Sequence, residues 1–320
     1  MKSKILVITP VKHIFGVAEK LESIGDVTYL DDPSEKEVLS AIKGYDAIFT
    51  NPNKSRVYLG KELIDASDQL KVICTASTGT THLNKKYLKK KNISILCLKE
   101  ERNIINKISS TAEHAFALTM SSIRNIYHGY RDVLKGGWDY EKFIGRQLDG
   151  LTIGIIGYGR LGTLYAKYSL VFGARVIVYD PYKKVEEKNI EQFDEIELLL
   201  NQSDVISFHI HVTNETEKMV NKILFNYMKP NVLLINTSRG EILDEEDLLE
   251  FLKNNNKAKI ATDVLSDEIN NRNKNPILEY ARKSDQVIIT PHIGGMTIEA
   301  QEIAYNHAAN LLLFYFKGVK

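Results

Sequence analysis

Three residues of different chemical type each follow a predicted strand in the last third of the chain, namely Arg239, Glu268 and His292. A guanidinium group pairs with a carboxylate through two parallel hydrogen bonds, so Arg239 could hold an acidic substrate and polarise a carbonyl beside it. His292 could give or take a proton near neutral pH. A carboxylate behind it, such as that of Glu268, would fix the orientation of the ring. Together the three types suit a proton-coupled reaction on a small acid.

A glycine pattern earlier in the chain indicates a dinucleotide. Gly157, Gly159 and Gly162 form G-x-G-x-x-G between an apolar strand predicted at 152–156 and an amphipathic helix predicted at 161–172. The first glycine allows a tight turn, the second leaves room for a pyrophosphate, and the third lets the helix approach the strand. Backbone N–H groups at the helix start would then bind the diphosphate.

An acidic residue completes this motif. The next predicted strand, 175–179, ends in Asp180, eighteen residues beyond Gly162. Its carboxylate would accept hydrogen bonds from the adenosine ribose and repel a ribose 2′-phosphate, so the sequence predicts NAD rather than NADP. The alternative is a glycine-rich turn without a ligand. The strand, helix and acid in the correct order favour the cofactor.

The elements that must position these residues form two alternating series. Short apolar segments alternate with helical ones, which is typical of an α/β protein with doubly wound parallel sheets, and the length of 320 residues predicts two domains. Residues 109 to about 134 are predicted as one long helix between the series, and a last helix is predicted at about 297–316. The predicted strands are 4–9, 27–30, 47–49, 72–75 and 93–96, then 152–156, 175–179, 204–208, 232–236, 259–263 and 286–290.

Composition excludes several other classes of protein. The formal net charge is +1, which gives no electrostatic footprint for nucleic acid or for an anionic membrane. Cys74 and Cys97 form neither a metal-binding spacing nor a disulfide framework, and we expect no metal. The apolar start of the chain is too short for a signal peptide, and no apolar run approaches a membrane span. The expected location is the cytoplasm.

The segments described above resemble the D-isomer-specific 2-hydroxyacid dehydrogenase family over essentially the whole chain. The segments around Arg239, Glu268 and His292 match those of the family's catalytic arginine, acid and histidine in order and spacing. The resemblance implies an NAD-dependent oxidoreductase that moves a hydride between a small D-2-hydroxy acid and its 2-oxo acid. It implies that these three residues are catalytic.

The resemblance also implies how the domains and the remaining site residues are arranged. A flavodoxin-like substrate domain would comprise residues 1–108 plus 293–320, and a Rossmann NAD-binding domain would comprise 109–292. Such enzymes are usually homodimers or larger, so a homodimer is expected. The substrate carboxylate would be bound by the backbone of Ser77, Thr78 and Gly79. The cofactor would be bound by Gly157, Gly159, Arg160, Leu161, Gly162, Asp180, His209, Thr237 and Asp263.

The departures from the family pattern include two proline positions, and three alternatives are open. Ile269 stands where a proline normally follows the catalytic acid, and His211 occupies another proline position.

Lys54 and Arg56 leave open a phosphorylated substrate such as 3-phosphoglycerate. A different enzyme on the same scaffold, a formate or phosphonate dehydrogenase, is one alternative. Another is an NAD-sensing binding protein related to transcriptional corepressors.

Overall fold

The computed structural model describes residues 2–52, 57–269 and 271–318. The chain divides into two compact units. The first unit comprises Met1–Ile108 and Gly295–Lys320, and the second unit is Ser109–Gly294. The second unit is therefore an insertion between two segments of the first. None of the described helices is both long enough and apolar enough to cross a membrane.

A five-stranded parallel sheet forms the centre of the first unit, with strand order β2-β1-β3-β4-β5. This order belongs to the doubly wound sheets of the flavodoxin type. The residues of β3 and β4 are all buried, as expected for central strands covered by helices on both faces. The strands are β1 Ser3–Val7, β2 Gly25–Tyr29, β3 Ala47–Thr50, β4 Val72–Thr75 and β5 Ser94–Leu96.

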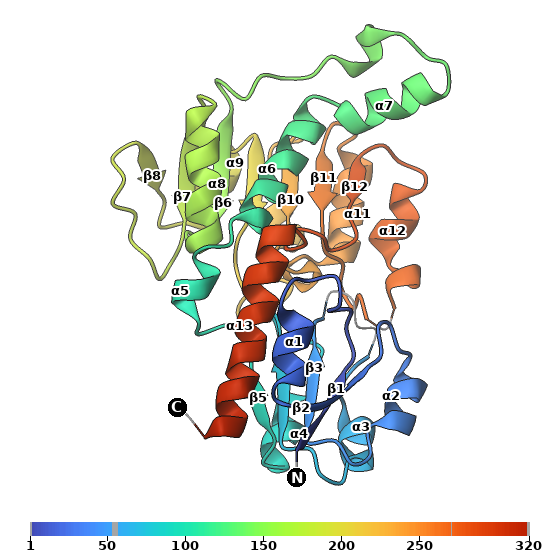
Figure 1. The fold of residues 1–320 in the computed structure, drawn as a ribbon. Helices are drawn as coiled ribbons and strands as arrows, with labels where there is room; N and C mark the ends of the chain where they lie inside the picture. Colours follow the sequence, from blue (N-terminus) through green and yellow to red (C-terminus); the bar gives the residue numbers. More distant parts are fainter. Residues whose placement is uncertain (1, 53–56, 270, 319–320) are drawn as a thin grey trace. The chain divides into compact units, whose positions relative to one another are not determined.

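Helices cover this sheet, and the longest comes from the C-terminal segment (Figure 1). Thr297 caps α13 by accepting a hydrogen bond from the Ala300 N–H, and Gly318 ends the helix in the left-handed conformation. Its buried face joins the same apolar cluster as β1, β3 and β4. The helices are α1 Val17–Glu22, α2 Glu35–Ala41, α3 Lys61–Ala66, α4 Lys85–Lys90, α5 Arg102–Ile105 and α13 Ile298–Lys317.

The second unit contains a seven-stranded parallel sheet with the order β12-β11-β10-β9-β6-β7-β8. Strand order reverses between β6 and β9, which is the arrangement of a dinucleotide-binding sheet. The predicted α/β class with two parallel sheets is confirmed. The strands are β6 Thr152–Ile156, β7 Arg175–Tyr179, β8 Ile190–Gln192, β9 Val205–Phe208, β10 Leu233–Asn236, β11 Lys259–Thr262 and β12 Val287–Ile289.

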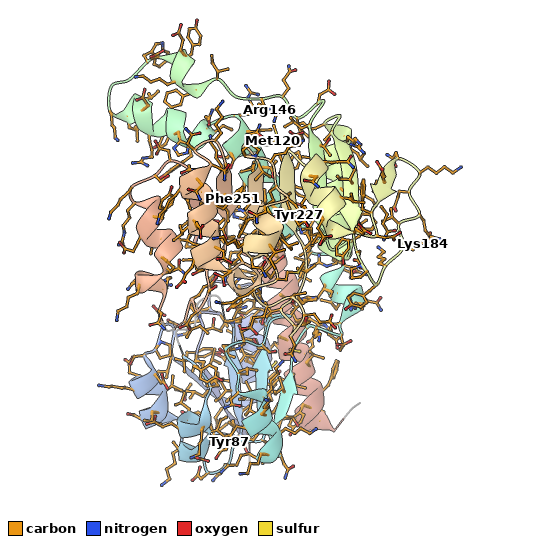
Figure 2. The ribbon with its side chains drawn as sticks, turned by 180° about the vertical axis from the view of Figure 1, so that it is seen from behind. Tyr87, Met120, Arg146, Lys184, Tyr227 and Phe251 are labelled. Atoms are coloured by element: carbon orange, nitrogen blue, oxygen red, sulfur yellow. The ribbon has the colours of Figure 1, made fainter. Side chains whose placement is uncertain are left out.

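Two apolar clusters pack on the two faces of this sheet. On one face lies Phe251 of α11, which is labelled in Figure 2. Its ring stacks on that of Phe225 of α10 with ring centroids 5.1 Å apart. The helices are α6 Ser110–Ile123, α7 Ile126–Leu134, α8 Arg160–Val171, α9 Ile196–Gln202, α10 Lys222–Phe225, α11 Glu245–Asn254 and α12 Pro276–Ala281. Short 3₁₀ turns occur at η1 Tyr140–Phe143, η2 Gly240–Ile242 and η3 Arg272–Lys274.

The prediction of one long helix over 109–134 is wrong. The helix ends at Ile123, and α7 starts again at Ile126. Between them Asn125 adopts a left-handed backbone with φ of 52°, a conformation that asparagine tolerates better than most residues. The Asn125 Oδ1 atom accepts a hydrogen bond of 2.7 Å from Lys259 Nζ, which holds the break in place.

Candidate functional site

The turn from β6 into α8 has the shape that the glycine pattern predicts. Gly157 has a φ of 92°, and a Cβ there would lie 2.6 Å from the His209 carbonyl oxygen. A Cβ on Gly162 would lie 2.1 Å from the Gly157 carbonyl oxygen, so only glycine fits. A Cβ on Gly159 would meet nothing within 4 Å, so this position borders open space. The turn therefore offers a cradle for a pyrophosphate.

The first turn of α8 borders this cradle. Arg160 and Leu161 are the first two residues of the helix, and Gly159 at the N-cap supplies no side-chain acceptor. The N–H groups in the first turn of any helix lack intrahelical partners and carry the positive end of the helix dipole. These residues fit the diphosphate of a dinucleotide.

Asp180 lies where the motif predicts it, at the end of β7. Its Oδ2 accepts a hydrogen bond of 2.7 Å from the Tyr158 N–H, within the glycine turn. Its Oδ1 accepts from the Tyr182 and Lys183 N–H groups at 2.9 and 3.0 Å. A carboxylate has about four lone-pair sites, so Oδ2 keeps one for a hydroxyl. The residue fits a ribose and also fixes the turn.

The side chain of His209 points into the protein. Its Nε2 lies 2.9 Å from Ser207 Oγ, and its ring packs 5.1 Å from that of Tyr165. Desolvation by burial lowers the pKa of His209 to about 3. The residue therefore approaches the glycine turn through its carbonyl oxygen, beside Gly157, rather than through its imidazole. Thr237, the other residue predicted from the resemblance near this edge, is buried directly after β10.

The three candidate catalytic residues follow three neighbouring strands, β10, β11 and β12, at their carboxyl ends. Arg239 directly precedes η2, and its Nη1 donates a 2.6 Å hydrogen bond to the Ser238 carbonyl. The buried Asn236 side chain shapes this turn, since its Nδ2 donates to the Arg239 carbonyl and its Oδ1 accepts from the Ser238 N–H. The guanidinium is thus carried by a turn with fixed geometry.

Glu268 and His292 form the pair that the sequence alone could only suggest. The His292 Nδ1 atom lies 2.7 Å from Glu268 Oε2. The other carboxylate oxygen of Glu268 accepts a hydrogen bond of 2.8 Å from the Leu265 N–H. His292 has a left-handed backbone with φ of 54°, and its N–H donates to the Asp263 carbonyl at 3.0 Å. The backbone thus holds both members of the pair and leaves Nε2 of the ring to face a reactant.

Asp263 organises the turn that carries His292. Its Oδ1 accepts from Thr290 Oγ1 at 2.6 Å and from the Ile293 N–H at 2.9 Å, while Oδ2 accepts from the Gly294 N–H at 2.7 Å. Burial by itself would raise the pKa of this carboxyl. Hydrogen bonds from the side chains of His114 and Thr290 and from the backbone of Gly294 and Ile293 lower the pKa below its ordinary value. Asp263 is therefore a buried carboxylate with one lone pair left on Oδ2, which fits a carboxamide donor.

Sequence reasoning missed two residues of this region. Glu241 is partly buried beside Arg239 and Glu268, and burial raises its pKa. His114 on α6 lies with its Nε2 2.9 Å from Thr290 Oγ1. The position of Glu241, two residues after Arg239, was a signal that could have singled it out. The position of His114 depends on long-range packing and leaves no such signal.

The predicted substrate segment lies in the first unit, directly after β4. Ser77 Oγ donates to the Gly79 carbonyl at 2.6 Å, and the Ser77 carbonyl accepts from the Leu98 N–H at 2.9 Å. Among the described residues, the N–H groups of Ser77, Thr78 and Gly79 have no hydrogen-bond partner. Successive free N–H groups suit an anion. The cations expected nearby, Lys54 and Arg56, lie outside the described residues.

Comparison with known proteins places this geometry in a family. Residues 116–294 match the family model of the D-isomer specific 2-hydroxyacid dehydrogenase NAD binding domain. The chain is also 32% identical over 318 residues to D-3-phosphoglycerate dehydrogenase of Methanocaldococcus jannaschii. The aligned stretch covers 98% of this chain and 58% of that protein. The chain belongs to the D-isomer-specific 2-hydroxyacid dehydrogenase family. It spans little more than half the length of this relative.

Two further proteins are similar to this chain over most of its length. Hydroxypyruvate reductase of Thermotoga maritima is 32% identical over 251 residues, which is 78% of each chain. The crystal structure of D-lactate dehydrogenase from Aquifex aeolicus, complexed with NAD and lactic acid, matches with a TM-score of 0.79 and 30% identity. That match covers 99% of this chain and 96% of the other. The fold is thus shared along the whole described length.

Proposed function

We propose that the protein is an NAD-dependent oxidoreductase that interconverts a small D-2-hydroxy acid and its 2-oxo acid. The observation that carries the proposal is the 2.7 Å contact between His292 Nδ1 and Glu268 Oε2. This pair lies at the carboxyl edge of a dinucleotide-type sheet, where ligands of doubly wound folds bind. Arg239, from the neighbouring strand, supplies the cation that an acidic substrate requires.

In this proposal Arg239, His292 and Glu268 have different tasks. Arg239 pairs with the substrate carboxylate and polarises the carbonyl. His292 gives a proton from Nε2 to the substrate oxygen during reduction and takes it back during oxidation. Glu268 holds the ring through Nδ1 and stabilises the imidazolium. The nicotinamide, when bound, supplies or accepts the hydride.

The cofactor is proposed to be NAD, held by the residues predicted from the sequence. The cradle at Gly157, Gly159 and Gly162 and the start of α8 would bind the diphosphate. Asp180 would bind the ribose hydroxyls and disfavour a 2′-phosphate. Asp263 would orient the carboxamide through its remaining lone pair on Oδ2.

The substrate is proposed to be a three-carbon 2-oxo acid such as hydroxypyruvate, with or without a phosphate. Two of the relatives named above act on compounds of this class according to their names, D-3-phosphoglycerate dehydrogenase and hydroxypyruvate reductase. A panel assay tests the activity and ranks the substrates. Purified protein and NADH are mixed with glyoxylate, pyruvate, hydroxypyruvate, 2-oxoglutarate or phosphohydroxypyruvate, and loss of NADH absorbance is followed.

The panel also separates the alternatives. Loss of absorbance with hydroxypyruvate or its phosphate supports the proposal. NADH binding without turnover on any acid would instead favour an NAD-sensing binding protein. Reduction of NAD by formate or phosphite, with no 2-oxo acid reduced, would assign the protein to formate or phosphonate oxidation.

We propose further that the protein is a homodimer that associates through α7 and the segment after it. No residue of α7 is buried, and an isolated helix of this length is marginal in water. Figure 1 shows α7 beyond the strand ends of the seven-stranded sheet. Trp138, which follows it, is 89% exposed. The exposed apolar side chains of this segment are Ile126, Tyr127, Tyr130, Val133, Leu134, Trp138, Tyr140 and Ile144.

Sedimentation velocity tests the dimer. The wild type is expected to sediment at twice the chain mass of 36.3 kDa. Leu134→Asp places a charge on the apolar segment and should shift the protein toward the monomer. Val171→Asp is the control, because Val171 is exposed on α8 outside this segment. A monomeric wild type, or a Leu134→Asp variant that stays dimeric, would contradict the proposal.

A further inference from the structure

The loop that carries Glu268 is bound from outside by a second carboxylate. Within this acid loop, residues 265–268, the Leu265 N–H donates to Glu268 itself at 2.8 Å. The next N–H, of Ser266, donates to Glu245 Oε1 at 2.9 Å. Glu245 is the first residue of α11, a helix that packs on the sheet and does not belong to the loop. The Glu245 carboxylate thus fixes the peptide next to the one that holds Glu268.

A buried asparagine completes this anchor. Asn275 is 4% exposed, and its Nδ2 donates to Glu245 Oε1 and Oε2 at 2.9 and 2.8 Å. Its Oδ1 accepts from the Ile277 N–H at 2.9 Å and thereby caps α12. The side chain therefore ties Glu245 to the start of another helix. We call Glu245 and Asn275 the loop anchor.

The backbone conformation of the acid loop depends on its surroundings. Asp267 has a positive φ of 50°, a conformation that non-glycine residues adopt only when their surroundings hold them there. Ile269, next to Glu268, leaves the backbone freer than a proline would. Glu241 contacts the same loop from another side, because its carboxylate accepts a hydrogen bond from the backbone of Asp267.

We propose that Glu245 is a positioning residue that acts through Glu268, with Asn275 holding Glu245 in place. The inference rests on the proposed dehydrogenase function. Hydrogen bonds to a carboxylate are stronger than those between neutral groups. Loss of the anchor frees the Ser266 peptide, and Glu268 loses its fixed distance from His292. Displacement of a catalytic group by about 1 Å lowers turnover roughly 100-fold.

A double-mutant cycle tests whether Glu245 acts through Glu268. Turnover is measured per NADH-binding site, so that misfolded protein does not count. Glu245→Ala alone should lower kcat about 10- to 100-fold while KM and the Kd for NADH change little. In a Glu268→Gln background, the same substitution should lower kcat less than threefold, because the group it positions is already lost. Equal losses in both backgrounds would overturn the proposal.

Conservative and control variants sharpen the test. Glu245→Gln keeps an oxygen for the Ser266 N–H and should recover most of the loss. Asn275→Asp keeps the cap on α12 but faces Glu245 with a second carboxylate, so it should reproduce the loss seen for Glu245→Ala. Glu246→Gln, one residue further along α11, is the matched control and should match the wild type, since Glu246 is exposed. Wild-type turnover in Asn275→Asp would refute the role of Asn275.

Hydrogen exchange tests the anchor independently of activity. Peptides spanning 264–269 should exchange faster in Glu245→Ala than in the wild type, and at the wild-type rate in Glu246→Gln. Unchanged exchange in Glu245→Ala would overturn the proposal even if turnover fell. If the wild type reduces no 2-oxo acid, or Glu268→Gln keeps full turnover, the proposed function or the role of Glu268 fails instead. The exchange result then still decides whether Glu245 holds the loop.

Discussion

The Tyr158 N–H donates a 2.7 Å hydrogen bond to Asp180 Oδ2, so one carboxylate links the end of β7 to the glycine turn. The residue expected to select the cofactor therefore also shapes its cradle. Asn in place of Asp keeps one side-chain oxygen as an acceptor but removes the negative charge. This substitution separates the two roles.

Asp180→Asn should weaken NADH binding and improve NADPH binding. A hydrogen bond to a charged group contributes roughly 1.5–3 kcal/mol, so the Kd for NADH should rise at least tenfold. Fluorescence titration with both cofactors measures the ratio of their Kd values. Asp194→Asn, at an exposed aspartate of the same unit, should leave the ratio unchanged. If the ratio of the two Kd values were unchanged in Asp180→Asn, Asp180 would not be the residue that selects between NADH and NADPH.

Arg239→Lys tests whether a planar fork is needed. Lysine keeps the charge but cannot form two parallel bonds to one carboxylate. With a 2-oxo acid as substrate, kcat/KM should fall about 100-fold while the Kd for NADH stays constant. Arg282→Lys, at an exposed arginine that pairs with Glu279, is the control. If Arg239→Lys retained full kcat/KM, the arginine would not bind the substrate carboxylate.

The buried ring of His209 should make the protein sensitive to acid. Its pKa is lowered from 6.5 to about 3 by desolvation, so the folded state keeps the ring neutral while the unfolded chain protonates it. The stability from the neutral ring is fully present above pH 6.5 and is lost as pH falls toward 3. Between pH 7.5 and 5, this one group should remove about 2 kcal/mol of unfolding free energy.

Urea unfolding of the wild type and of His209→Gln at the two pH values measures this contribution. Glutamine can still reach Ser207 but does not titrate, so the difference in unfolding free energy between the two proteins should change by about 2 kcal/mol. Subtraction cancels the other titrating groups. A difference that is independent of pH would mean that His209 protonates equally in the folded and unfolded states.

The break at Asn125 should matter for stability. Alanine is disfavoured in the left-handed conformation by roughly 1–2 kcal/mol, whereas glycine adopts it freely. Asn125→Ala should therefore lower the melting temperature more than Asn125→Gly, although both lose the hydrogen bond to Lys259. Equal melting temperatures for the two variants would show that the backbone conformation contributes little.

Asn125 also illustrates where sequence reasoning stopped. Apolar spacing continues from Ser109 to Leu134 with no proline and with no glycine at the break, so periodicity alone predicts one helix. The break depends on a contact with Lys259, more than a hundred residues away, which no local pattern reveals. β8 was missed for a similar reason, because Ile190–Gln192 is too short to show alternation.

The parallel strands and the glycine turn were predictable because local chemistry determines them. β4, β6 and β7 have the bounds that their apolar, β-branched runs predict. The start of α12 was also within reach, since Asn275 followed by a proline is a standard helix-start signal. The Glu268–His292 distance was beyond reach, because it depends on how β11 and β12 pair.

The most direct test of the account compares the wild type with His292→Ala in NADH-dependent reduction of hydroxypyruvate or its phosphate. His292→Ala should lose at least a thousandfold in kcat and still bind NADH with wild-type affinity, because the proton donor is removed and the cradle is untouched. Wild-type turnover by His292→Ala would contradict the proton-transfer role and, with it, the proposed chemistry of this site.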